Sequence, residues 1–296
     1  MNAGAEEIIV TARRSGIPVW LVTSSTTTAI LVGTIGGVTP GTRWDPASLD
    51  AALTKADRVM FPEAFGVSGG LFTMIGALGK WRNQASLPKG QTLQSMTSPA
   101  QWARLVALRD RGVLKSGFER KHPFHLAMML RGVVKDRRKF SPGADAYARR
   151  FLRGNKGKRV PIAQGNAKEI MADFFGSAPR SHVACLMDTV ARVEAGGTGI
   201  EARFNAAKTR SEAWATRRVP DALASKSEDG QRSCWPSGSR FDQAREASLS
   251  PTIARSLSTQ QVTLAVVSLE SLAEPGGVLD DLLAQGFDVR GPRWKR

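Results

Sequence analysis

The fold is decided by one stretch, residues 18–37, which reads PVWLVTSSTTTAILVGTIGG. Two runs rich in β-branched and apolar residues, 19–23 and 28–32, flank a small polar turn. In the first run Val19, Leu21 and Thr23 alternate with Trp20 and Val22, which is the period of a strand. The pattern predicts a β-hairpin.

A helix and a third strand are expected next. Asp45-Pro46 supplies an N-cap acceptor followed by a proline at the first helical position. Apolar residues then recur at helical spacing as far as Ala56, so we expect a helix over about 46–56. Residues 58–61, RVMF, read as a buried strand that returns to the same sheet.

The C-terminal part is β-rich as well. Residues 262–267, VTLAVV, form a strand candidate, and an apolar helix follows from Val278. Gly286 is placed to end that helix in a left-handed turn, and residues 287–289 can form a last short strand. Between about 97 and 256 the sequence is predominantly helical, apart from a short extended piece at 159–162.

These elements predict an α+β fold, with a mixed β-sheet built from N- and C-terminal segments around a predominantly helical middle. We expect one domain over residues 18–292, preceded by an N-terminal tail at 1–17. With 296 residues and 42% apolar content, the chain can bury a substantial core. No run of about 18 apolar residues predicts a membrane helix, and the N-terminus lacks the basic-then-apolar order of a signal peptide.

Positive charge is concentrated in one part of the chain. The formal net charge is +16, and residues 131–159 contain eleven bases against Asp136 and Asp145. Such a field attracts polyanions, so Arg149, Arg150 and Arg153 are candidate anion-binding residues. Anionic polysaccharide, peptide or a membrane surface are admissible partners, whereas no motif for sequence-specific nucleic-acid binding is present. The alternative is a solvated basic helix surface, and we favour it.

The two cysteines differ in context. Cys185 lies in an apolar stretch, while Cys234 lies in a loop-like segment rich in Ser and Gly. In an oxidising compartment the two could form a disulfide. A buried structural thiol and an unrelated surface thiol explain the pattern equally well.

Residues 18–63, with Gly33-Thr34, Trp44 and the 58–63 run, resemble the opening of the TraB/GumN family, which includes PrgY-like and Tiki-like proteins. Members expected to be active, such as the Tiki-type metalloproteases, carry a histidine two residues after the Gly-Thr pair. This chain has Gly36 there. The C-terminal block also resembles the family and places Ser271 where the family has its second histidine.

Other parts of the resemblance are incomplete. Ser268 and Glu270 stand where the family has turn glycines, and Ser211 replaces an asparagine that follows the family arginine, here Arg210. Gln164 stands where the family often has a glutamate. Glu63 matches the carboxylate expected after the early strand, so the resemblance leaves Glu63 and Arg210 as candidate catalytic residues.

A hydrolytic metal needs about three protein ligands and an open position for water. Glycine has no ligand atom and a serine hydroxyl is a poor substitute for imidazole, so we expect no cofactor. Manganese, cobalt or zinc would bind only if a rearranged site exists. His122 and His125 stand at i, i+3 around Pro123, but we interpret them, and His182, as packing or solvated histidines.

Three functions follow from this sequence. The favoured hypothesis is a degenerate, metallohydrolase-like pseudoenzyme that binds or scaffolds through a remaining cleft lined by Glu63, Gly36, Arg210 and Ser271. The second is an active peptidase or hydrolase whose rearranged site uses Glu63 with Glu270, Gln164 or a histidine. The third is a module that binds anionic polymers. The resemblance implies a periplasmic or cell-envelope location, after removal of a signal peptide, and a cytoplasmic location is the alternative.

Overall fold

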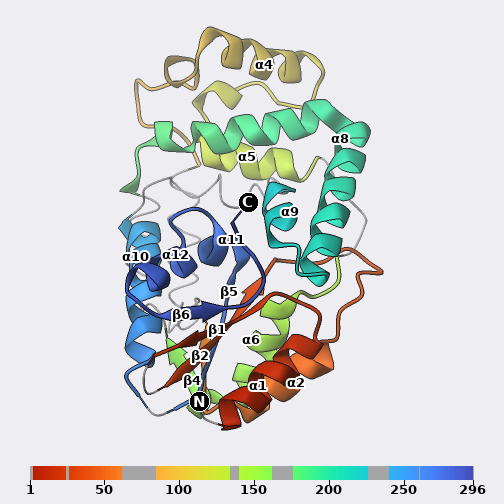
Figure 1. The fold of residues 1–296 in the computed structure, drawn as a ribbon. Helices are drawn as coiled ribbons and strands as arrows, with labels where there is room; N and C mark the ends of the chain where they lie inside the picture. Colours follow the sequence, from red (N-terminus) through yellow and green to blue (C-terminus); the bar gives the residue numbers. More distant parts are fainter. Residues whose placement is uncertain are drawn as a thin grey trace.

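The computed structural model describes residues 3–24, 27–61, 85–133, 140–161, 176–225, 240–259 and 261–295 (Figure 1). Within these residues the chain forms a six-stranded sheet in the order β4-β3-β5-β2-β1-β6, accompanied by many helices. The strands are β1 Val19–Thr23, β2 Thr28–Thr34, β3 Arg58–Phe61, β4 Arg159–Pro161, β5 Thr263–Ser268 and β6 Asp288–Arg290. The predicted α+β fold is therefore confirmed.

The sheet is mixed. β1 and β2 form the predicted antiparallel hairpin, with Val19 opposite Val32 and Thr23 opposite Thr28, and β6 pairs antiparallel with β1. β5 inserts between β2 and β3 and runs parallel to both, and β4 runs parallel to β3. The carboxyl ends of β2, β5, β3 and β4 therefore lie at one edge of the sheet, called here the carboxyl edge.

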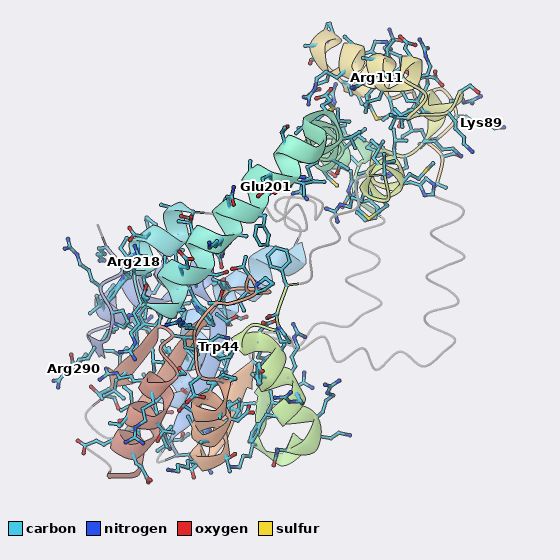
Figure 2. The ribbon with its side chains drawn as sticks, turned by 90° about the vertical axis from the view of Figure 1, so that its right-hand side faces the viewer. Trp44, Lys89, Arg111, Glu201, Arg218 and Arg290 are labelled. Carbon is cyan, nitrogen blue, oxygen red and sulfur yellow. The ribbon has the colours of Figure 1, made fainter. Side chains whose placement is uncertain are left out.

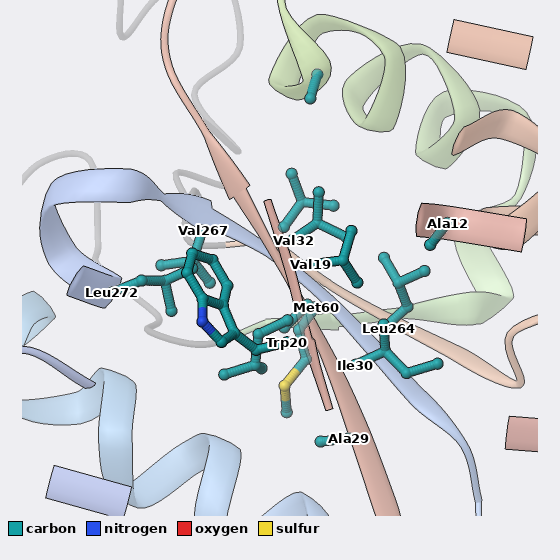
Figure 3. Close-up of a cluster of buried hydrophobic side chains, with 14 of the residues drawn as sticks. Ala12, Val19, Trp20, Ala29, Ile30, Val32, Met60, Leu264, Val267 and Leu272 are labelled. Carbon is teal, nitrogen blue, oxygen red and sulfur yellow. The ribbon is translucent and has the colours of Figure 1, made fainter. Parts of the chain in front are cut away.

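Helices cover both faces of the sheet. One face is covered by α1 Ala3–Arg14, α2 Pro46–Lys55 and α6 Ala144–Gly154, and the other by α10 Arg240–Ser256, α11 Leu269–Ala273 and α12 Val278–Ala284 (Figures 1 and 3). Val19 and Leu264 point toward Ala12 of α1, whereas Trp20 points toward Leu272 of α11 (Figure 3). Because both faces are buried, β2 is apolar or small at almost every position and every residue of it is buried.

The first helix replaces the N-terminal tail that we expected over residues 1–17. Ala5, Ile8, Ile9 and Ala12 are nearly fully buried and join the core of the sheet. Their spacing of i, i+3, i+4, i+7 gives α1 an apolar stripe, which explains why the segment packs instead of extending into solvent. The helix contacts α2 and the first two strands.

A second group of helices lies apart from the sheet. It consists of the turns η1 Gln94–Met96, η2 Phe118–Arg120 and η4 Pro179–His182, the helices α4 Pro99–Asp110 and α5 Pro123–Arg131, and the start of α8 Val183–Ala215. These elements enclose their own hydrophobic core, which includes Leu105, Leu126 and Leu186. We call this group the helical lobe, and the sheet with its covering helices the sheet lobe.

α8 connects the two lobes (Figure 2). Its first residues, such as Val190, are buried in the core of the helical lobe, and its last, such as Trp214, in the core of the sheet lobe. The predominantly helical middle that the sequence predicted includes this long helix, which is kinked at Gly196, where φ is 52° and ψ is −138°. From Val219 to Ala224 the short helix α9 follows.

Candidate functional site at the carboxyl edge

The topology brings the positions singled out in the sequence to the carboxyl edge. β2 and β5 are neighbours there, with Thr34 opposite Ser268. Gly36 follows β2, and Glu270 and Ser271 follow β5. Sheets with parallel strands commonly bind ligands outside these carboxyl ends. The carboxyl edge is therefore the candidate functional site.

Two of the predicted residues fall outside the described part of the chain. Glu63 comes two residues after the end of β3, and Gln164 comes three residues after the end of β4. Their roles, including the catalytic role suggested for Glu63, stay predictions. The cleft expected from the sequence stays a prediction too, because Glu63 was to line it.

Gly36 is exposed and has open space beside it. A Cβ atom added at Gly36 would meet no other heavy atom of the described residues within 4 Å. The next residue is different, since a Cβ at Gly37 would lie 2.8 Å from Cβ of Phe140. Val38 and Ser141 also exchange backbone hydrogen bonds of 2.9 and 2.8 Å. The chain before α6 thus packs on residues 37–38 but leaves the position of the family histidine open.

A buried ion pair occupies the candidate site. Nη2 of Arg210, from the last part of α8, donates to Oε1 of Glu270 in α11. The two side chains are only 8% and 14% exposed. Nε of Arg210 is buried as well and has no hydrogen-bond partner in the described structure. The carboxylate of Glu270 therefore neutralises the charge of Arg210, the arginine that the family pattern places on this helix.

Ser271 is part of a helix cap. The Ser268 hydroxyl accepts from the backbone N–H of Ser271 at 3.1 Å and donates to the Ser271 hydroxyl oxygen at 2.7 Å. Ser268 is the N-cap residue of α11. A serine hydroxyl can accept a backbone N–H at a helix N-cap, whereas glycine has no side chain to do so. The residues that depart from the family pattern here therefore cap a short helix at the carboxyl edge.

The end of α8 is fixed to the segment that follows β2. Nε1 of Trp214 donates to the carbonyl of Gly33 at 2.9 Å, and the hydroxyl of Ser211 accepts from the backbone N–H of Thr39 at 3.1 Å. Trp214 is fully buried. Trp214 therefore fixes the chain before Gly36, and Ser211, which replaces the family asparagine, fixes it after Gly36.

The candidate anion-binding arginines lie on α6, and all three are exposed. Arg149 pairs with Asp145 at 3.8 Å, and its guanidinium lies 4.7 Å from the centroid of the Phe61 ring at the end of β3. Arg150 pairs with Asp50 at 3.4 Å. Within the described structure, the side chain of Arg153 forms no ion pair and no hydrogen bond.

The three histidines lie together in the helical lobe, away from the carboxyl edge. The rings of His122 and His182 are 5.1 Å apart, and Nδ1 of His122 accepts from the backbone N–H of Phe124 as the N-cap of α5. Burial, and then the charges of His182 and His125, lower the pKa of His122 to about 4. Burial also lowers the pKa of His125. This packing agrees with the interpretation as structural histidines.

The described residues contain no group of three or more His, Cys, Asp or Glu side chains arranged to hold a metal ion. Cys185 is fully buried in the core of the helical lobe. Cys234 lies outside the described residues, so the pairing of the two cysteines stays a prediction. Among the described helices, none is long and apolar enough to cross a membrane.

Sequence reasoning missed the partner of Arg210. We considered Glu270 only as an alternative carboxylate for a rearranged hydrolase. Two signals pointed to the ion pair: Glu270 follows a strand that ends at the carboxyl edge, and Arg210 lies on the helix that the family pattern brings to that edge. Neither signal gives the distance between two elements that are about sixty residues apart.

The fold and this edge define a mixed α+β protein with a candidate site where four parallel strands end. The model of the TraB/PrgY/gumN family matches residues 18–291, nearly the whole chain. The protein therefore belongs to the TraB/PrgY/gumN family. Searches of curated proteins and of solved structures gave no match.

Proposed function

We propose that the protein is a binding or scaffolding domain whose ancestral hydrolytic metal site has degenerated, and that it acts at the cell envelope. The single observation that carries the proposal is the buried Arg210–Glu270 ion pair at the carboxyl edge. It supports the proposal because it supplies a cation, and consumes a carboxylate, at the edge where a metalloenzyme of this family would need metal ligands.

The residues present there do not fit a divalent metal. Gly36 offers no ligand atom, and the Ser271 hydroxyl is engaged with Ser268. A guanidinium held in a poorly solvated position repels a second cation. Glu270 could reach a metal only by leaving Arg210 as an unpaired buried charge, which is costly. We therefore derive no catalytic step through a metal.

Metal binding tests the proposal directly. The protein is stripped of metal and titrated calorimetrically with manganese, cobalt and zinc. We expect no saturable binding, and no peptidase or esterase activity above that of a buffer blank. Tight, stoichiometric binding that is lost in Glu63→Ala and kept in the matched control Glu201→Ala, an exposed acid on α8, would show that a rearranged hydrolase site survives.

A second variant separates a lost site from a damaged fold. Gly36→His places an imidazole where the structure has open space, so it should fold like the wild type. If Gly36→His combined with Ser271→His gains metal binding that the wild type lacks, the edge retains the geometry of a metal site and has lost only its ligands. If the wild type already binds as tightly as this double variant, the proposal is wrong.

The location is tested separately. Cells that make the native protein are fractionated, and we expect it in the envelope or periplasmic fraction. Recovery with the cytoplasmic marker would remove the envelope part of the proposal and leave the conclusion about the metal ligands unchanged.

A further inference from the structure

One face of α6 carries more positive charge than the ion pairs of the described structure compensate. Ala144, Ala148 and Leu152 are buried against the sheet lobe, while Arg149, Arg150 and Arg153 are exposed. Residues three and four apart share a helix face, so the three arginines form one stripe. Lys156, in the turn η3 Lys156–Lys158 that follows, is exposed as well. We call these four residues the α6 basic face.

The charge of this face is only partly compensated. Between 144 and 161 the sequence has six bases and one acid. Asp145 pairs with Arg149 at 3.8 Å, and Asp50 pairs with Arg150 at 3.4 Å. Arg153 and Lys156 form no ion pair in the described structure. Lys158, by contrast, turns inward and donates to the Ala56 carbonyl at 2.8 Å.

Nearby aromatic rings are already engaged. Trp44 contacts Tyr147 edge-on with centroids 5.3 Å apart, and the Arg150 guanidinium lies 4.4 Å from the Tyr147 centroid. Arg149 lies over Phe61. Proteins that hold single-stranded nucleic acid stack its bases on open aromatic rings. Since the rings here are covered, the face is poorly suited to bases.

The α6 basic face also lacks apolar anchors. Leu152 is buried, and Tyr147 and Phe151 pack partly against the core. Helices that lie on membranes insert a wide apolar face, and protein interfaces usually centre on buried aromatic or aliphatic anchors. A row of guanidinium groups without such anchors instead matches repeated carboxylates, which arginine binds in a planar, bidentate geometry.

From this charge complementarity we propose that the α6 basic face binds an acidic polysaccharide, a linear chain of sugars that carry carboxylates. Successive turns place the cations about 5.4 Å apart along the helix, so several carboxylates of one chain can be held together. This proposal goes beyond the absence of a metal site and does not depend on it. Failure of one leaves the other standing.

The test uses polygalacturonate as the probe, with binding to the full chain measured by calorimetry at low and at moderate salt. We expect saturable binding that weakens as salt is added. Arg153→Glu with Lys156→Glu should weaken it about tenfold, because the variant loses two cationic contacts and gains two carboxylates that repel the ligand. Neither residue has a contact that folding requires, so the variant should fold normally.

A matched control variant tests whether net charge alone explains the loss of binding. Arg111→Glu with Lys115→Glu makes the same change of net charge at exposed positions of the helical lobe, and we expect less than about a twofold loss. An equal loss in both variants would overturn the proposal, since net charge alone would then explain binding. Tighter binding of polyglutamate, of an oligonucleotide or of anionic lipid vesicles would overturn it in favour of that partner. Absence of binding at low salt would also refute it.

Discussion

The sheet lobe and the helical lobe bury their cores in different ways. The sheet lobe joins segments from both ends of the chain, since β2 pairs with β5 across more than two hundred residues. The helical lobe packs α4, α5 and the start of α8, which lie closer together in sequence. Candidate chemistry lies at the edge of the first lobe and all three histidines lie in the second. We infer that the lobes can respond separately to mutation and to pH.

The largest test of this comparison removes one core aromatic from each lobe. Trp20→Ala in β1 and Phe118→Ala in η2 delete side chains that are 0% and 3% exposed. Each should cost about 3 to 5 kcal/mol. With native-state hydrogen exchange during urea unfolding, Trp20→Ala should weaken protection mainly in the sheet lobe, and Phe118→Ala mainly in the helical lobe. Equal loss in both lobes from either variant would show one cooperative unit, as expected for a single domain over 18–292.

Breaking the Arg210–Glu270 ion pair at the carboxyl edge should give the next largest loss in the free energy of unfolding. Arg210→Met leaves Glu270 as a buried, unpaired carboxylate, and we expect a loss of about 3 kcal/mol. Combining it with Glu270→Leu removes both charges and should recover most of the loss. Chemical denaturation of the single and double variants measures this coupling. Simple additivity of the two single variants would mean that the pair contributes little.

Lowering the pH from 6.5 toward 5 should destabilise the helical lobe more than the sheet lobe. The pKa of His122 is about 4 in the folded protein and its ordinary value is 6.5, so the unfolded state binds more protons between these values. The contribution of neutral His122 to the free energy of unfolding is therefore fully present above pH 6.5 and is lost as the pH drops toward 4. This loss is on the order of 2 kcal/mol after allowance for partial solvent contact.

The control for this effect is His122→Asn, which keeps an acceptor for the α5 cap. It should flatten the decline between pH 6.5 and 5, a range in which most exposed carboxylates stay ionised. Hydrogen exchange should show the change in α5 and in the start of α8. A similar decline in the sheet lobe, whose described residues contain no histidine, would contradict the assignment.

Substitution of one helix N-cap in each lobe should give the smallest loss of stability. Ser98 forms a capping box with Gln101 at the start of α4, and Asp45 accepts from the backbone N–H of Ala47 at the start of α2. Ser98→Ala and Asp45→Ala should each cost about 1 kcal/mol. Thermal unfolding followed by hydrogen exchange should locate each loss in its own lobe. A larger loss for Ser98 than for Trp20 would reverse the order proposed here.

Much of the sheet lobe could be predicted from local signals. The hairpin followed from alternation, α2 from Asp45-Pro46, and the end of α12 from Gly286, which has φ of 85°. α1 could have been found too, because Ile8 and Ile9 lie on a helical stripe with Ala5 and Ala12. We expected a tail there instead, because the family resemblance begins only at residue 18.

The candidate site was harder to predict. Its positions followed from the resemblance, and the topology brings Gly36, Glu270 and Ser271 to one edge as expected. The contacts among them did not follow, because they depend on the relative placement of α8, α11 and β2. The core of the helical lobe was missed for the same reason. Its leucines show helical spacing, but spacing does not reveal whether a helix packs on the sheet or on other helices.

The kink at Gly196 gives α8 one point at which its two halves can change their relative angle. No residue between 191 and 209 is fully buried, so around that point the described structure holds the helix only through partial packing of Val193 and through surface contacts such as the Arg104–Glu194 ion pair. The thirteen residues from Val183 to Ala195 extend about 20 Å from Gly196. A rotation of about ten degrees at this single glycine would therefore carry the far end of the arm through roughly 3 Å, and the helical lobe would travel with it while the carboxyl edge kept its geometry.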